Sequence, residues 1–172
     1  NHFFLGTDFA TGFNELVSEA PQTLSRFYDT ALKYTGFLIF LAGFIYAIIK
    51  RKNSALLIFG IGALGFSIIM LKAGLPFAHH SYYVIPFVPF MALIAGQFLS
   101  ELNKSWLAVL LLAVCIIESS VNHQDDFRIR DRFEFITTLD QDIAPYIPAD
   151  AKIGINCYPN PTPMYFAHRK GW

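Results

Sequence analysis

The chain has 172 residues, of which 54% are hydrophobic and 15% are charged, and its formal net charge at pH 7 is zero. Soluble domains carry about 25% charged residues, so this composition argues against an ordinary soluble domain. The neutral balance also gives no reason to expect a nucleic acid as partner. Because the middle of the chain is almost free of charge, the sequence predicts a membrane part followed by a water-soluble tail.

The two ends of the chain indicate a piece of a longer protein. The sequence starts at Asn1 and stops at Trp172, and it shows no basic stretch, short apolar stretch and cleavage site in succession. We therefore expect the chain to be a piece of a longer protein, and a processed mature chain is the alternative.

Residues 1–33 are mixed polar and apolar, and we expect them to form an extracytoplasmic loop with an interfacial helix. A helix is predicted over residues 21–33, with Pro21 near its first turn. One apolar stripe recurs along it at helical spacing: Leu24, Phe27, Ala31 and Tyr34. Such a helix can lie on the membrane surface or pack on a neighbouring loop, and the sequence leaves both open.

Four apolar segments follow, and each approaches the roughly 20 residues that a membrane-spanning helix needs. They cover residues 34–49, 54–71, 82–99 and 105–119. Buried helices of a large soluble protein are the alternative, but the segments contain no Asp, Glu, Lys, Arg or His except Glu118, which lies next to the end of the fourth. The sequence therefore predicts a mainly α, polytopic membrane bundle of about four transmembrane helices within residues 34–120.

Positive residues in the first short turn predict the orientation of these segments. Lys50, Arg51 and Lys52 lie between the first and second segments, and such residues favour the cytoplasmic side. The connections are short, so the helices alternate in direction. The 72–81 loop and the tail are then expected outside the membrane on the extracytoplasmic side.

Glycines and prolines predict how the segments pack. Gly60, Gly62 and Gly65 lie in the second segment, where small residues let membrane helices approach closely. Pro86 and Pro89 lie in the third segment and each removes a backbone donor. Because the freed carbonyls need partners in lipid, we expect the third segment to lie inside the bundle.

Residues 121–172 predict the start of a small extracytoplasmic α/β domain. An amphipathic helix is expected to begin after Asp125 or Asp126, and either residue can serve as its N-cap. Its buried face would carry Phe133, Ile136, Leu139 and Ile143. A short strand is expected at residues 152–157, then a short helical run after three prolines. One strand makes no sheet, so the remaining strands are expected beyond the chain.

A polar cluster before the third segment is the densest candidate site: His79, His80, Ser81, Tyr82 and Tyr83. Adjacent histidines on a helix point about 100° apart, which disfavours joint binding of one metal ion. Histidine and tyrosine can both donate hydrogen bonds to phosphate oxygens. The cluster therefore predicts an anionic headgroup as ligand. Interfacial aromatics with exposed histidines are the alternative without a ligand.

The stretch "HHSYYVIPFVPFMALIAG" resembles the outer-loop and helix pattern of GT-C type membrane glycosyltransferases, the protein-mannosyltransferase-like and aminoarabinose-transferase-like families. In that pattern a basic residue precedes Tyr, two apolar residues and Pro, which here are His79 and residues 83–86, followed by Pro89. The tail is similar too, with residues 165–172 resembling a "YY-x-x-R-x-G-W" stretch. The likeness extends over the whole chain.

The resemblance implies the transfer of a sugar from a polyprenyl-phosphate carrier to a lipid, glycan or protein acceptor at the outer membrane face. It implies that Tyr83 and His79 lie near the carrier phosphate, with His80 and Tyr82 beside them. The resemblance implies that the acidic residue that acts as the catalytic base lies upstream. No catalytic residue is therefore assigned here, although Asp8 and Glu15 are expected on the outer side. A divalent metal, if used, would be held by residues outside the fragment. The expected location is the bacterial inner (plasma) membrane.

Two other classes stay open. A transporter or flippase subunit would more often place ionisable residues in mid-membrane. A structural membrane subunit with an extracytoplasmic interaction domain would need no chemistry at the polar cluster. An acidic residue in an upstream outer loop would favour the enzyme.

Overall fold

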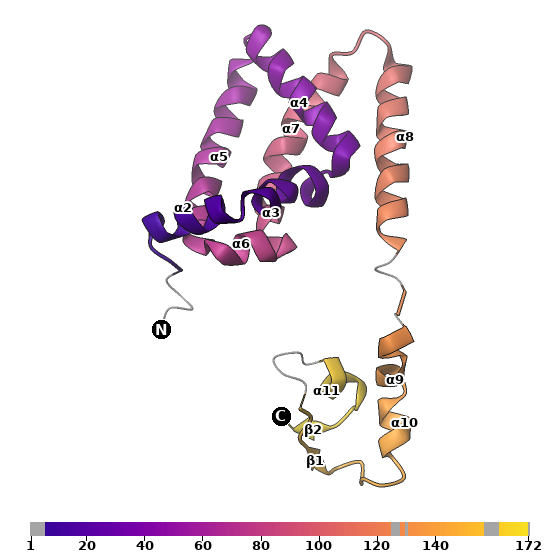
Figure 1. The fold of residues 1–172 in the computed structure, drawn as a ribbon. Coiled ribbons are helices and arrows are strands. Elements are labelled where there is room, and N and C mark those ends of the chain that lie inside the picture. The colour runs from indigo at the N-terminus through magenta and orange to yellow at the C-terminus, as the bar shows by residue number, and fades with distance from the viewer. Residues whose placement is uncertain (1–5, 125–127, 130, 157–161, 172) are drawn as a thin grey trace. The chain divides into compact units, whose positions relative to one another are not determined.

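The computed structural model describes residues 6–124, 128–129, 131–156 and 162–171. The chain divides into two units, Asn1–Asn122 and His123–Trp172. The described part of the first unit is almost entirely helical (Figure 1). Its elements are α2 (Phe9–Ser18), α3 (Ala20–Ser25), π-helical η1 (Arg26–Ala31), α4 (Lys33–Ile49), α5 (Asn53–Ala73), α6 (Leu75–His79), 3₁₀-helical η2 (Ser81–Phe87), α7 (Val88–Ser100) and α8 (Ser105–Asn122).

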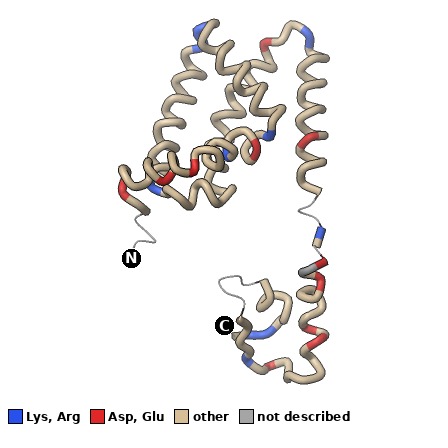
Figure 2. Tube along the Cα trace, viewed as in Figure 1, with Lys and Arg blue, Asp and Glu red and all other residues tan. Residues whose placement is uncertain are grey.

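The long helices define two ends of this unit (Figure 1). The α4–α5 turn lies at one end. The short helices α2, α3 and α6 lie at the other end, beside α5 and α7. Charged residues gather near the helix ends, and most of the length of α4, α5 and α7 carries none (Figure 2). The polar cluster from residue 79 to residue 83 therefore lies at the same end as α2 and α3.

Three helical stretches are long and apolar enough to cross a membrane: Asn53–Ala73, Ser81–Ser100 and Ser105–Asn122. They contain the predicted segments 54–71, 82–99 and 105–119, and the mainly helical fold is confirmed. The predicted segment 34–49 forms α4, which has 17 residues. It reaches spanning length only together with Ala20–Ala31, from which it is bent by 94°. Within the described residues the count is therefore three, or four if this bent pair is one span.

The core of the first unit is aromatic. Phe66 of α5 stacks on Phe87 of η2 with ring centroids 4.7 Å apart. Phe77 of α6 is completely buried and contacts Phe66 and Phe27 at 5.9 and 6.0 Å between centroids. This cluster joins α5, α6, η1 and η2, so it fixes the short helices onto the end of the long ones.

The third predicted segment is the most buried of the three span-length stretches. Of its residues 22% are buried, against 6% in α5 and none in α8. Pro86 lies in η2, and Pro89 lies in the first turn of α7. The two prolines lie on either side of the point where the 3₁₀ helix η2 changes to the α-helix α7. Proline has no backbone N–H to donate, and at this change of helix type the two missing α-helical hydrogen bonds are not needed.

The glycine prediction was partly wrong. A Cβ at Gly60 or Gly65 would meet nothing within 4 Å, whereas one at Gly62 would collide with the Phe90 ring. A closer helix contact lies at Gly43 of α4, which the sequence did not single out. A Cβ there would come 2.7 Å from the Ile94 carbonyl oxygen of α7. Which glycine lies at an interface depends on helix rotation, and residue type alone does not give that.

Replacing Gly43 with Ala should destabilise the bundle by about 1–3 kcal/mol, the usual cost of overpacking. Its new methyl group would meet backbone atoms, which cannot rotate away. Gly60→Ala is the matched control, because its methyl group enters open space and alanine favours a helix. Thermal unfolding in detergent micelles measures both variants. Equal stability of the two would contradict the close α4–α7 contact.

The helix predicted over residues 21–33 is broken. It forms α3 and then η1. The apolar stripe does not face one surface, because Phe27 and Ala31 pack against the core. Leu24 and Tyr34, in contrast, are 59% and 53% exposed. Within η1, the Arg26 Nε and Nη2 donate to the Ala78 carbonyl oxygen at 3.0 and 2.6 Å. This guanidinium fixes η1 onto α6. The helix α2 was not predicted.

A second polar contact secures α8 to the bend before α4. Glu118 of α8 accepts hydrogen bonds from the backbone N–H groups of Tyr34 and Thr35 at 3.1 and 2.9 Å. The first N–H groups of a helix lack partners within the helix, so a carboxylate satisfies them. Glu118 therefore stabilises the start of α4. Its own helix, α8, has no buried residue among those described.

At the opposite end, Lys52 and Glu101 form an ion pair, and the Tyr46 hydroxyl donates to Glu101 Oε2 at 3.2 Å. The hydrogen bond from Lys52 holds the pKa of Glu101 below its usual value, and Glu101 raises the pKa of Lys52. These contacts join the α4–α5 turn to the end of α7. Both carboxylate and ammonium are partly exposed, so the pair contributes little to stability.

The described part of the second unit holds η4 (Asp131–Phe133), α9 (Glu134–Thr137), α10 (Leu139–Ile143), β1 (Lys152–Ile153), α11 (Thr162–Phe166) and β2 (Lys170–Gly171). The predicted amphipathic helix is thus interrupted at Thr138. Of its expected buried face, Ile136 is buried, Leu139 and Ile143 are half-buried and Phe133 is 42% exposed. Its expected caps, Asp125 and Asp126, lie outside the described residues.

The strand prediction holds for two residues, Lys152 and Ile153. The rest of the predicted 152–157 stretch is not strand as far as residue 156, and Cys157 lies outside the described residues. Contrary to expectation, β1 has a partner within the chain, since β2 pairs with it in parallel, Lys152 opposite Lys170 and Ile153 opposite Gly171. The predicted short helical run is α11, but it begins at Thr162 and so includes Pro163, the third of the prolines it was expected to follow.

Candidate functional site

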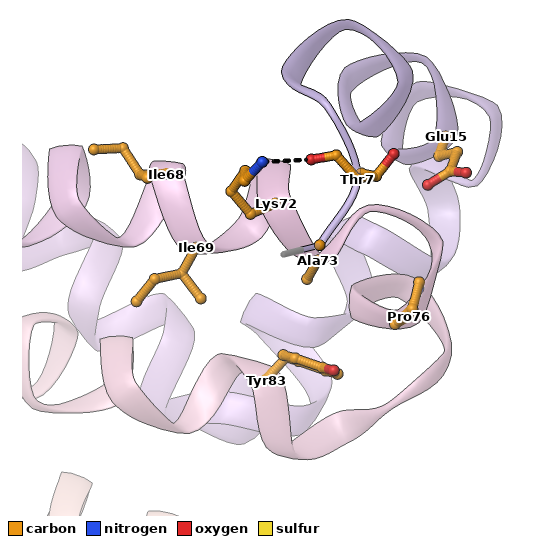
Figure 3. Close-up of a pocket in the computed structure, with 9 residues that line it drawn as sticks. Thr7, Glu15, Ile68, Ile69, Lys72, Ala73, Pro76 and Tyr83 are labelled. Carbon is orange, nitrogen blue, oxygen red and sulfur yellow. Dashed lines mark hydrogen bonds between the residues drawn. The ribbon is translucent and has the colours of Figure 1, made fainter. Parts of the chain in front are cut away.

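A cavity of about 730 Å³ lies at the end of α5, beneath α2 and beside η2 (Figure 3). We call it the α5-end pocket. Its volume falls in the range of about 300–1,000 Å³ that is typical of small-molecule sites. Side chains from five parts of the chain line it: Gly6, Thr7, Glu15, Ile68, Ile69, Lys72, Ala73, Pro76 and Tyr83. The pocket therefore combines one cation, one carboxylate and one phenol with an apolar wall.

Lys72 supplies the positive charge of the α5-end pocket. It lies in the last turn of α5, one residue beyond the predicted second segment. Its ammonium donates to the Thr7 carbonyl oxygen at 2.8 Å and lies 5.2 Å from the centroid of the Phe9 ring. The Thr7 N–H in turn donates to the Lys72 carbonyl oxygen at 2.9 Å. A lysine has three donors, so Lys72 can hold Thr7 and still turn a donor to a ligand.

Tyr83 faces the same pocket from η2 (Figure 3). It is half-buried and packs against the aromatic core, which holds the ring in place. Its backbone N–H donates to the His80 carbonyl oxygen at 3.4 Å, in the turn that follows α6. Tyr83, which the sequence predicts as a site residue, therefore lines the same pocket as Lys72, which the sequence pattern did not single out. The signal for Lys72 was a lone cation at the end of an apolar helix.

Glu15 of α2 brings a carboxylate to the α5-end pocket. Its Oε2 accepts the Leu75 backbone N–H at 2.8 Å and so caps the start of α6. The sequence placed Glu15 outside without giving it a role. Its position between α2 and α6 follows from tertiary packing. Lys72 and Glu15 together make the formal charge of the pocket zero.

Tyr82 faces a different cavity. A groove of about 440 Å³ runs between η1 and η2, with Tyr82, Ser81 and Thr30 among polar lining residues and Val84 and Val88 among apolar ones. The Tyr82 and Tyr83 rings are 4.7 Å apart between centroids. The two neighbouring tyrosines thus contact each other but line separate cavities. The sequence had grouped them in one site.

The two histidines do not line either cavity. His79 is exposed at the end of α6. The His80 ring stacks on Tyr82, with centroids 5.4 Å apart and planes 24° apart. Among the described residues, no group of three or more His, Cys, Asp or Glu side chains is arranged to hold a metal ion. Of the four predicted site residues, Tyr83 therefore has the position best suited to a ligand.

Searches of protein-family models, curated proteins and solved structures found no match to this chain.

Proposed function

We propose that this chain is the C-terminal part of an integral-membrane glycosyltransferase that moves a sugar from a polyprenyl-phosphate carrier to an acceptor. The single observation that supports the proposal is the α5-end pocket, which Lys72 and Tyr83 both line at the end of a helix of spanning length. A phosphate attached to a membrane lipid lies at that depth. A cation and a hydroxyl are the donors that such a phosphate needs.

The proposed transfer uses these two side chains at the leaving group. The acceptor oxygen forms a bond to the anomeric carbon while the bond from that carbon to the phosphate oxygen breaks. The phosphate leaves with the electron pair, and the acceptor proton passes to a carboxylate base. Lys72 and the Tyr83 hydroxyl would stabilise the negative charge on the departing phosphate.

The base is expected upstream of this chain, as in the families that the sequence resembles. Glu15 has a structural role in the proposal, since one of its oxygens caps α6. Its negative charge would oppose a phosphate in the pocket, and the Lys72 ammonium offsets it. Any divalent metal would likewise be held by residues outside the chain.

The proposed location is the bacterial inner (plasma) membrane, with the lysine-rich α4–α5 turn in the cytoplasm and the α5-end pocket outside. Lys50, Arg51 and Lys52 support this orientation, because positive residues in short loops favour the cytoplasm. The partners would be the lipid-linked sugar, the bilayer and a lipid, glycan or protein acceptor.

Two measurements on the full-length protein test this proposal. Purified protein in liposomes should transfer labelled sugar from a polyprenyl-phosphate donor. If no transfer occurred with any donor sugar, the proposed enzymatic activity would be contradicted.

The second measurement tests the orientation in the membrane. Single cysteines replace Ser81 or Asn103 after Cys115 and Cys157 are changed to Ala. An impermeant maleimide added to intact cells with a permeabilised outer membrane should label position 81 and spare position 103. The reverse pattern would overturn the orientation.

A further inference from the structure

The surface of α2 divides into three sectors along its length. Gly12 and Leu16 are buried against the rest of the unit. Asn14 and Ser18 form an exposed polar sector. Between these two sectors lies an exposed apolar stripe of Phe9, Phe13 and Val17, which we call the α2 stripe. Residues four apart lie on one face of a helix, so the three side chains form a continuous surface.

The α2 stripe is large for an exposed surface. Phe9, Phe13 and Val17 are 53%, 58% and 56% exposed, although the helix is firmly packed on its other side. A Cβ at Gly12 would collide with the Leu71 carbonyl oxygen, so the α2 backbone touches the end of α5. This contact fixes which sector of α2 turns outward. The α2 stripe is therefore held in a fixed orientation on the outside of the unit.

The α2 stripe adjoins exposed apolar residues near the end of α5. Phe9 lies against the Lys72 ammonium in the last turn of α5, 5.2 Å from ring centroid to nitrogen. Ile68 and Ile69, one turn earlier, are 51% and 47% exposed on a helix apolar enough to cross a membrane. Apolar residues on the span, a lysine at its end and the stripe thus form one surface. Lysines at the ends of spans place the ammonium among headgroups and the stem in the apolar layer.

We propose that α2 is an interfacial membrane helix whose α2 stripe enters the bilayer at the level of the lipid headgroups, with its polar sector in water. The three sectors match what such a helix needs, an apolar face in the acyl boundary and a polar face outside it. The occupant of the stripe is lipid because the stripe is continuous with the exposed face of α5. This inference does not depend on the proposed enzymatic activity.

A consequence concerns the α5-end pocket. Two residues that line the pocket belong to this region: Thr7 precedes α2, and Glu15 lies in the second turn of α2. If the stripe lies in lipid, the pocket opens at headgroup depth, and an amphiphile can reach it from within the membrane. A ligand free in water would have no need of the stripe.

Spin labels on neighbouring positions of α2 test the proposal. Phe13→Cys places a label on the stripe, and Asn14→Cys places a matched label on the polar sector, in full-length protein with Cys115 and Cys157 changed to Ala. Liposomes of phosphatidylethanolamine and phosphatidylglycerol supply the bilayer. The label at 13 should collide with oxygen and lose collisions with a water-soluble nickel chelate, and the label at 14 should show the opposite preference.

Each other outcome would overturn the proposal. A label at 13 that collides freely with the nickel chelate would place the stripe in water. A label at 13 that is shielded from both reagents would show that another protein segment or a second copy covers it. A melting temperature close to that of the unlabelled protein verifies folding, since both substituted side chains are exposed.

Discussion

Replacing Tyr83 with Phe in the full-length protein should lower sugar transfer about ten- to a hundredfold. The change removes one hydroxyl donor, and a hydrogen bond to a charged group contributes about 1.5–3 kcal/mol, with each 1.4 kcal/mol worth about a factor of ten in rate. The phenylalanine ring keeps the packing of Tyr83 against the aromatic core. Initial rates with a polyprenyl-phosphate donor in liposomes measure the effect.

Tyr82→Phe is the matched control for this experiment. It makes the same chemical change one residue earlier, on a side chain that is 56% exposed and lines the groove between η1 and η2. Its transfer rate should stay within about twofold of wild type, because the proposal places the carrier phosphate in the α5-end pocket, which Tyr82 does not line. A well-folded Tyr83→Phe protein with wild-type turnover would refute the role of Tyr83. A large loss in Tyr82→Phe alone would move the site to the groove.

Phe77→Ala should be the most destabilising single change considered for the first unit. Phe77 is completely buried and touches the rings of Phe27 and Phe66. Deleting a buried phenylalanine side chain costs about 3–5 kcal/mol, because contacts are lost and a cavity is left. Helix packing in membranes depends on the same close contacts. Unfolding in mixed micelles with increasing dodecyl sulfate measures the loss.

Leu64→Ala is the control for the core substitution. Leu64 lies on α5 and is 69% exposed, so its removal leaves no cavity, and we expect a change within about 0.5 kcal/mol. Phe77→Ala should also loosen α6, whose start is capped by Glu15. If both variants unfolded at the same denaturant concentration, the aromatic cluster could not be the element that fixes α6 to the bundle.

The α5-end pocket brings together segments that lie far apart in the sequence. Thr7 comes from the segment before α2, Glu15 from α2, Lys72 from the end of α5 and Tyr83 from η2. Arg26 adds a further long-range contact by holding the Ala78 carbonyl next to this region. A substitution at any of these positions would act on the pocket through contacts with other segments. Of the residues that line the pocket, Tyr83 and Lys72 are the two that the proposed function assigns to the phosphate.

The sequence by itself determined the long helices and their order. Their apolar length and lack of charge are local properties, so residues 54–71, 82–99 and 105–119 predicted three helices of spanning length. Tyr83 could also be chosen in advance, because a polar aromatic pair before an apolar run is visible in the sequence. The turn between α4 and α5 was likewise marked by its basic residues.

Only the tertiary structure decided what surrounds these elements. The bend of 94° before α4, the contact at Gly43 and the separation of Tyr82 from Tyr83 depend on helix rotation and crossing, which residue pattern does not encode. Lys72 lines the pocket because the start of the chain folds back over the end of α5. The hydrogen bond from Lys72 to Thr7 joins residues that are 65 positions apart in the sequence. Local propensity acts over a few residues, whereas such contacts arise only when distant side chains pack together.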